Sequence, residues 1–163
     1  MSRNVPPRRI LCAVDFTHAS AVAASYACQM AEGLGASLIL CHALTEAPDI
    51  LSLEGMFTPG AGWPGSEEAT RRWKEDAERR LRLLADTLPL DEVELRVDEG
   101  DPAEAILQAA VDVDADAIFV GSHGRRGFRR ALVGSVAERL VRWSPVPVTV
   151  VRWSEQPDVD EAP

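Results

Sequence analysis

Three glycines and a serine near the carboxyl end of the chain have types and a spacing suited to binding phosphate. Two residues separate Gly121 from Gly124, and nine residues separate Gly124 from Gly134, which Ser135 follows directly. Glycine lets the backbone turn sharply and approach a ligand without a Cβ in the way. A helix is expected to begin at Gly134 and Ser135, and the unpaired N–H groups of a helix start attract anions. The Ser135 hydroxyl could either cap that helix or bond a phosphate oxygen.

This segment is basic, whereas the whole chain is acidic. Residues 121–142 contain six arginines and one acid, Glu138, in a chain of formal net charge −9. The overall charge argues against a general nucleic-acid binder, because a polyanion would be repelled at long range. A local excess of positive charge still suits a small polyphosphate. A purely structural interpretation also stays open, because glycines often serve connectivity alone and clustered arginines are commonly solvated.

Residue types elsewhere in the chain do not indicate a catalytic or metal centre. The three histidines, His18, His42 and His123, lack metal-like spacing with cysteines or carboxylates. His42 follows Cys41 on an expected strand, where neighbouring side chains point to opposite faces. A Gly-Lys-Ser/Thr phosphate motif is absent from the sequence. We therefore predict no catalytic residue and no metal site formed by side chains.

The elements that must position these residues alternate between strand and helix. Short apolar runs predict strands over residues 10–14, 37–43, 93–98, 115–120 and 145–151. Such alternation predicts an α/β fold, a doubly wound parallel sheet of five strands with helices on both faces. In such sheets ligands bind beyond the carboxyl ends of the strands, at the topological switch point. Asp15 and Gly121 each end a strand and are suited to that place.

Helix boundaries and buried faces can also be predicted. Thr17, Asp101 and Ser135 are expected to cap helix N-termini, and Gly35 is expected to end the first helix. The second long helix is expected over residues 66–88, with a mixed-charge, solvated outer face. Side chains expected on the buried face of the first helix are Ala23, Ala27, Met30 and Leu34. Those expected on the buried face of the second are Trp73, Ala77, Leu81, Leu84 and Leu88.

The 163-residue length fits one domain, which we place at residues 1–152. Within it, residues 45–65 are expected to form a long loop rich in glycine and proline. Residues 153–163 hold four acids and no base, which is typical of a disordered tail. Three cysteines without close spacing predict reduced thiols and a cytoplasmic protein. Two of them, Cys12 and Cys41, lie in expected strands and are predicted to be buried. No apolar run is long enough to span a membrane, so no membrane partner is expected.

The Gly-x2-Gly-x9-Gly-Ser spacing resembles the signature of ATP-binding universal stress proteins. Similarity to that family extends from Arg9 to Arg152 and includes the sequence Val-Asp-Phe-Thr after the first strand. The resemblance implies the sheet order 3-2-1-4-5. The nucleotide-binding positions that it implies are Ala13, Val14, Asp15, Ala43, Val120, Gly121, Gly124, Arg125, Gly134, Ser135 and Val136.

The resemblance also implies roles and partners. Asp15 is expected to meet the adenine or ribose edge, and Ala43 to contact the base. Val120 and Gly121 are expected to flank the ribose, and the residues expected to surround the phosphates are Gly124, Arg125, Gly134, Ser135 and Val136. The expected ligand is ATP, with AMP or ADP as alternatives and with Mg²⁺ or Mn²⁺ bound through the phosphates. A homodimer paired through residues 146–151 is expected, and the implied function is that of a stress-response regulatory module. The alternatives are a slow ATPase or autophosphorylating enzyme, and a dimeric adaptor without ligand.

Overall fold

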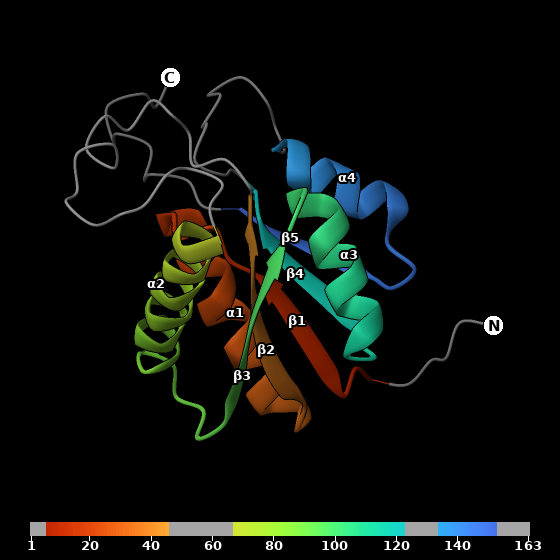
Figure 1. Cartoon of the computed structure of the whole chain (residues 1–163). Helices are drawn as coiled ribbons and strands as arrows, with labels where there is room; N and C mark the ends of the chain where they lie inside the picture. Colours follow the sequence, from red (N-terminus) through yellow and green to blue (C-terminus); the bar gives the residue numbers. More distant parts are fainter. Residues whose placement is uncertain (1–5, 46–66, 123–133, 153–163) are drawn as a thin grey trace, which may run out of the picture.

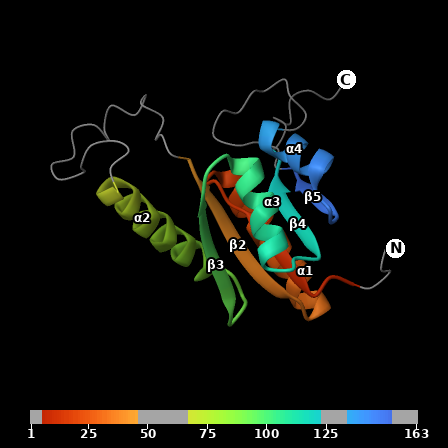
Figure 2. The same ribbon diagram turned by 45° about the vertical axis from the view of Figure 1, so that its right-hand side comes forward.

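The computed structural model describes residues 6–45, 67–122 and 134–152, which form alternating strands and helices. The strands are β1 (Arg9–Ala13), β2 (Ser37–Leu44), β3 (Val93–Glu99), β4 (Ala117–Gly121) and β5 (Val148–Val151). The helices are α1 (His18–Leu34), α2 (Glu67–Ala85), α3 (Pro102–Asp112) and α4 (Ser135–Trp143). Helices α1 and α2 cover one face of the sheet, and α3 and α4 cover the other (Figure 1; Figure 2).

The five strands form one parallel sheet in the order β3-β2-β1-β4-β5. The chain runs outward from β1 to β3, then returns to place β4 on the other side of β1. In the centre of the sheet, Leu11 pairs with Ile39 on β2 and with Ile118 on β4. The predicted doubly wound fold and its strand order are thus confirmed, and the switch point lies between β1 and β4.

Two apolar layers pack against the two faces of the sheet. On β1, Ile10 and Cys12 face the α1–α2 layer, whereas Leu11 and Ala13 face the α3–α4 layer. All four side chains are buried. Burial on both faces explains why this strand has a continuous apolar run instead of an alternating pattern. The rigid centre of the sheet therefore supports the ends of β1 and β4.

The ends of α1 were predicted correctly, but part of its buried face was not. Thr17 accepts a hydrogen bond from the Ser20 N–H at 3.3 Å, and Gly35 ends the helix in the left-handed region with φ 63°. Met30 and Leu34 were expected in the core but are 37% and 40% exposed. The buried face is formed instead by small side chains: Ala19, Ser20, Ala23, Ala24, Ala27, Cys28 and Ala31. Small side chains let a helix lie close to the sheet, which favours this face over the bulkier one.

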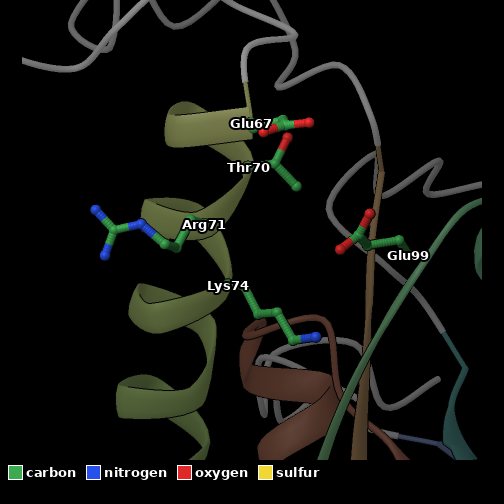
Figure 3. A pocket seen from close by; sticks show the side chains of 5 residues that line it. All are labelled: Glu67, Thr70, Arg71, Lys74 and Glu99. Atoms are coloured by element: carbon green, nitrogen blue, oxygen red, sulfur yellow. The ribbon is translucent and has the colours of Figure 1, made fainter.

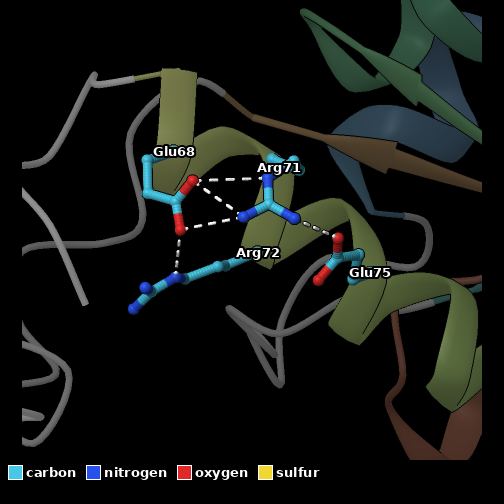
Figure 4. A network of polar contacts seen from close by, with 4 residues as sticks. All are labelled: Glu68, Arg71, Arg72 and Glu75. Carbon is cyan, nitrogen blue, oxygen red and sulfur yellow. Dashed lines mark hydrogen bonds and ion pairs between the residues drawn. The ribbon is translucent and has the colours of Figure 1, made fainter. Parts of the chain in front are cut away.

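Helix α2 has a narrower buried face than predicted and the expected solvated outer face. Ala77 and Leu81 are buried, whereas Trp73, Leu84 and Leu88 are only half-buried, and Leu88 lies beyond the helix end. Ion pairs between neighbouring turns cover the outer side, as Figure 4 shows for Glu68, Arg71, Arg72 and Glu75. Because these side chains are exposed to solvent, their ion pairs contribute little to stability.

Several expectations concern segments that the structure does not describe. The predicted loop at 45–65, except for Thr45, and the predicted tail at 153–163 lie outside the described residues. Within the described ranges, no helix combines the length and the apolar character that crossing a membrane requires.

Candidate functional site

The candidate site lies where β4 ends and α4 begins. Gly121 is the last residue of β4, and the Ser122 N–H that follows donates to the Val151 carbonyl at 2.9 Å. The Gly134 N–H then donates to the Ser122 carbonyl at 2.6 Å. This hydrogen bond brings the start of α4 directly beyond the carboxyl end of β4, although residues 123–133 separate them in the sequence. The structure therefore places Gly121, Gly134 and Ser135 at one edge of the sheet, as predicted.

The first turn of α4 has N–H groups without an acceptor in the part of the chain that the structure describes. Gly134, not Ser135, is the N-cap, with φ −70° and ψ 156°, and no side chain caps the helix. The prediction of Ser135 as the cap is therefore wrong: the hydrogen bond from Gly134 to β4 fixes the cap one residue earlier and leaves Ser135 as the first helical residue. Within the described residues, the N–H groups of Ser135, Val136 and Ala137 have no hydrogen-bond acceptor, whereas the next N–H, of Glu138, donates to the Gly134 carbonyl at 2.9 Å.

Two other helices have side-chain caps at the corresponding place. The Thr17 hydroxyl caps α1, and Asp101 Oδ1 caps α3 by accepting from the N–H groups of Ala103 and Glu104 at 3.1 Å each. Helix α4 instead presents unpaired donors and the positive end of its dipole at the carboxyl edge of the sheet. That arrangement attracts an anion.

An ion pair fixes α4 against α3. Arg139 Nη1 lies 2.7 Å from Asp101 Oδ1, and Arg139 Nη2 lies 3.5 Å from Glu104 Oε1. The Arg139 guanidinium, which donates to Asp101, lowers the pKa of that carboxyl below its ordinary value. The ion pair adds to the packing of α4 through Ala137 and Leu140, which are buried against the sheet.

Gly121 is required by packing within the protein. A Cβ at this position would lie 3.0 Å from the carbonyl carbon and oxygen of Ala19 and 3.2 Å from the Ser20 nitrogen. Real Cβ atoms rarely approach backbone this closely, so β4 and the start of α1 fit together only with glycine here. The sequence suggested a ligand as the reason for glycine at this position, whereas the structure shows a close contact with the α1 backbone.

Asp15 lies at the carboxyl end of β1, beside the switch point. Its Oδ1 accepts hydrogen bonds from the Thr17 N–H at 3.0 Å and from the Thr17 hydroxyl at 2.5 Å. Its own N–H donates to the Ser20 hydroxyl at 3.3 Å. Phe16, between Asp15 and Thr17, has a positive φ of 64°. The carboxylate is therefore part of a tight turn that links β1 to the cap of α1.

The remaining predicted positions divide into two groups. Ala13 and Val120 are buried and Ala43 and Val136 are half-buried, and all four side chains contact the core on the α3–α4 face. Val14 is buried on the opposite, α1–α2 face. These residues support the edge of the sheet, and only their backbone or exposed atoms could meet a ligand. Gly124 and Arg125, the other two predicted positions, lie outside the described residues.

A large open cavity lies at the β3 side of the same carboxyl edge, apart from the ends of β1 and β4, and does not suit a polyphosphate. It has a volume of about 440 Å³ and lies between the start of α2 and the end of β3, lined by Glu67, Thr70, Arg71, Lys74 and Glu99. Figure 3 shows the Arg71 guanidinium pointing away from Glu99, consistent with its ion pairs to other α2 residues. Two carboxylates then face the cavity with one ammonium group, so the cavity has the wrong charge for phosphates.

Sequence reasoning missed a stack of side chains beneath the Asp15 turn. The rings of Phe16 and His42 have centroids 4.4 Å apart, and Arg80 Cζ lies 3.9 Å from the Phe16 ring centroid. These residues come from the β1–α1 turn, β2 and α2. No local sequence pattern could have identified them, because only the tertiary structure brings them together.

The buried thiols match their predicted structural role. Cys12 and Cys41 are buried on opposite faces of the sheet. Burial raises the pKa of the Cys41 thiol to about 12, and it also raises the pKa of the Cys12 thiol. Cys41 and His42 point to different faces, as expected for neighbours on a strand. Among the described residues, no group of three His, Cys, Asp or Glu side chains is arranged to hold a metal ion.

Comparisons with a family model and with individual relatives point to the same protein family. Residues 6–152 match the model of the universal stress protein family. A universal stress protein of Thermus aquaticus is 36% identical over 147 residues, which cover 89% of this chain and 98% of that protein. A longer universal stress protein of Mycolicibacterium smegmatis is 34% identical over 88% of this chain, which spans 45% of that relative.

Solved structures show the same fold. The structure of the protein MJ0577 has a TM-score of 0.74 and 25% identity, covering 93% of this chain and all of that one. A universal stress protein in complex with cAMP has a TM-score of 0.64 and 24% identity over 91% of this chain and 99% of that one. One from Archaeoglobus fulgidus in complex with dAMP has a TM-score of 0.55 and 24% identity over 88% of this chain and 96% of that one. From its sequence match and its fold, the chain belongs to the universal stress protein family.

Proposed function

We propose that the chain binds an adenine nucleotide, with ATP as the first candidate, at the carboxyl edge of the sheet between β1 and β4. The uncapped start of α4 carries this proposal, because the N–H groups of Ser135, Val136 and Ala137 are available to phosphate oxygens. Similar structures in complex with cAMP and dAMP support adenine as the base. AMP and ADP are the alternative ligands.

In this proposal the residues at the two strand ends have separate tasks. The Asp15 carboxylate meets the adenine or ribose edge while its Oδ1 continues to accept from Thr17. Gly134 and Ser135 lie beside the phosphates, with Gly124 and Arg125 completing that side. Mg²⁺ or Mn²⁺ binds through the phosphate oxygens and not through a cluster of protein side chains.

Binding is tested by isothermal titration calorimetry of purified protein with ATP, ADP and AMP, with and without Mg²⁺. The informative variant is Asp15→Asn, which keeps an oxygen for the Thr17 hydrogen bonds but removes the charge. A hydrogen bond to a charged group contributes about 1.5–3 kcal/mol, so the affinity should fall roughly tenfold to hundredfold. Wild-type protein that shows no heat with any of these nucleotides would contradict the proposal.

We further propose that occupancy of this site serves regulation and not turnover. Phosphate release under saturating ATP separates this proposal from slow hydrolysis: turnover well above ~1 per minute, against about 10 per second for ordinary enzymes, would favour the enzyme. Purified protein without bound or bindable nucleotide would instead favour an adaptor.

The proposed unit is a homodimer paired through residues 146–151. β5 is an edge strand with half-buried valines, and an unpaired apolar edge favours pairing with another chain. Size-exclusion chromatography with light scattering should give about twice the 17.7 kDa chain mass.

Ending the chain at Arg152 should leave ATP affinity unchanged, because we place the domain at residues 1–152.

A further inference from the structure

A cluster of three side chains, Arg80, Phe16 and His42, which we call the stack, lies against the turn that carries Asp15. Arg80 of α2 places its guanidinium carbon 3.9 Å from the centre of the Phe16 ring. The Phe16 ring also contacts the His42 ring, at a centroid distance of 4.4 Å and an interplanar angle of 41°. A cation over an aromatic face is attracted by the ring quadrupole. Phe16 is thus held by groups from two other elements, β2 and α2.

The two partners of Phe16 differ in burial. His42 is 8% exposed, and its Nδ1–H donates to the Val14 carbonyl at 2.7 Å, which ties β2 to the last residue before Asp15. Arg80 belongs to the α2 segment whose Ala77 and Leu81 side chains are buried against the sheet. The buried imidazole is held in place, whereas Arg80 is an exposed residue whose guanidinium covers the half-buried Phe16 ring from the α2 side.

The backbone at Phe16 shows why the turn needs such support. Its φ of 64° lies in the left-handed region, which non-glycine residues adopt at an energetic cost. A glycine would adopt this φ freely, but it would lack the ring that Arg80 and His42 hold. The turn itself places Asp15, since the carboxylate is fixed by the N–H and hydroxyl of Thr17, the next residue after Phe16.

We infer that the stack of Arg80, Phe16 and His42 is a positioning device that sets nucleotide affinity through the orientation of Asp15. The inference rests on the proposed function, because it concerns the same site. Phe16 acts as a positioning residue beneath the turn. Through Arg80, helix α2 contacts the Phe16 ring beneath the binding site. A substitution of Arg80 therefore alters the orientation of Asp15 through that ring.

The test compares ATP affinities of stack variants by calorimetry. Phe16→Leu keeps an apolar side chain without an aromatic face, and Phe16→Gly relieves the positive φ but removes the ring. Both should weaken ATP binding by roughly threefold to thirtyfold, the range that corresponds to loss of one cation–π contact. Phe16→Tyr keeps the aromatic face and should restore most of the affinity. Phe16→Gly binding ATP as well as the wild type would overturn the inference.

Variants of α2 separate positioning from a general effect on folding. Arg80→Met removes the cation and keeps an apolar stem, and Arg80→Lys keeps a cation over the ring. The matched control is Arg82→Met, an exposed arginine two residues along the same helix. Arg80→Met should weaken binding by about threefold to tenfold, whereas Arg80→Lys and Arg82→Met should stay near wild type. Equal effects of Arg80→Met and Arg82→Met would overturn the role of Arg80.

A double-mutant cycle between Phe16→Leu and Asp15→Asn gives the decisive readout. If Phe16 acts through Asp15, the Phe16 substitution should cost little affinity once the Asp15 charge is absent. Additive losses would show a merely structural effect and overturn the inference. Wild-type protein that binds no ATP would overturn both proposals. ATP binding that weakens in Asp15→Asn but not in Phe16→Leu would overturn this inference and leave the proposed function standing.

Discussion

We expect Ser135→Asp to stabilise the fold and to weaken ATP binding at the same time. Ser135 is the first residue of α4 and its side chain is exposed, so an aspartate can be accommodated without repacking. A negative charge in the first turn of a helix interacts favourably with the dipole and contributes about 0.3–1 kcal/mol. The same charge would lie beside the N–H groups that we assign to the phosphates.

The expected loss of affinity follows from Coulomb repulsion. Two unit charges 4 Å apart repel by about 1 kcal/mol in bulk water and by about 4 kcal/mol at the effective dielectric constant near a protein surface. Each 1.4 kcal/mol changes the dissociation constant by about tenfold. One carboxylate beside one phosphate charge should therefore weaken ATP binding by roughly fivefold to several hundredfold. The effect should diminish at high salt, because the Debye length is about 8 Å at 0.15 M ionic strength.

Calorimetry with ATP and thermal unfolding without ligand measure the two effects separately. Ser135→Asn is the matched control, because asparagine has the size of aspartate without its charge. We expect the asparagine variant to bind ATP within a few-fold of wild type and the aspartate variant to bind far more weakly while unfolding at an equal or higher temperature. Equal ATP affinities for the two variants would refute the assignment of the α4 start to the phosphates.

Three further predictions concern the surroundings of the site. Gly121→Ala should destabilise the fold by about 1–3 kcal/mol in urea denaturation, because its Cβ would lie 3.0 Å from the α1 backbone; an unchanged unfolding midpoint would contradict this packing. The ion pair with Arg139 lowers the pKa of Asp101 below its ordinary value of 3.8. The ion pair should therefore stabilise the fold fully above about pH 3.8, and this stabilisation should be lost as the pH falls through the lowered pKa of Asp101 in the folded protein. In Asp101→Asn, acid unfolding followed by circular dichroism should no longer show the loss of stability that protonation of Asp101 causes in the wild type. Cys12 and Cys41, buried and with raised pKa values, should resist iodoacetamide at pH 8 until the protein is unfolded, as mass spectrometry would show; rapid labelling of the native protein would contradict their burial.

Local patterns in the sequence were enough to predict the architecture. The apolar run at 10–14 indicated a strand buried on both faces, and the cap residues Thr17 and Asp101 marked helix starts that the structure confirms. The strand order came from the family resemblance. Because parallel strands end at one edge of the sheet, the order also indicated where Asp15 and Gly121 would lie.

Features that depend on tertiary packing could not be predicted in the same way. Helix α1 is apolar on more than one face, so periodicity alone did not distinguish the small side chains that pack on the sheet from the exposed Met30 and Leu34. Gly134 and Ser135 are both favourable cap residues, and the hydrogen bond from Gly134 to the end of β4 decides between them. The stack on Phe16 joins residues from three elements, which no window of sequence contains.

The central claim is that amide groups at the start of α4 bind the phosphates of an adenine nucleotide. The most direct measurement follows the backbone amide signals of Ser135, Val136 and Ala137 by NMR while ATP is added with Mg²⁺. We predict that the shifts of these three signals are among the largest of the backbone amides and that they saturate at one nucleotide per chain. Signals that stay unchanged while ATP binds, or shifts confined to the cavity between α2 and β3, would contradict the claim.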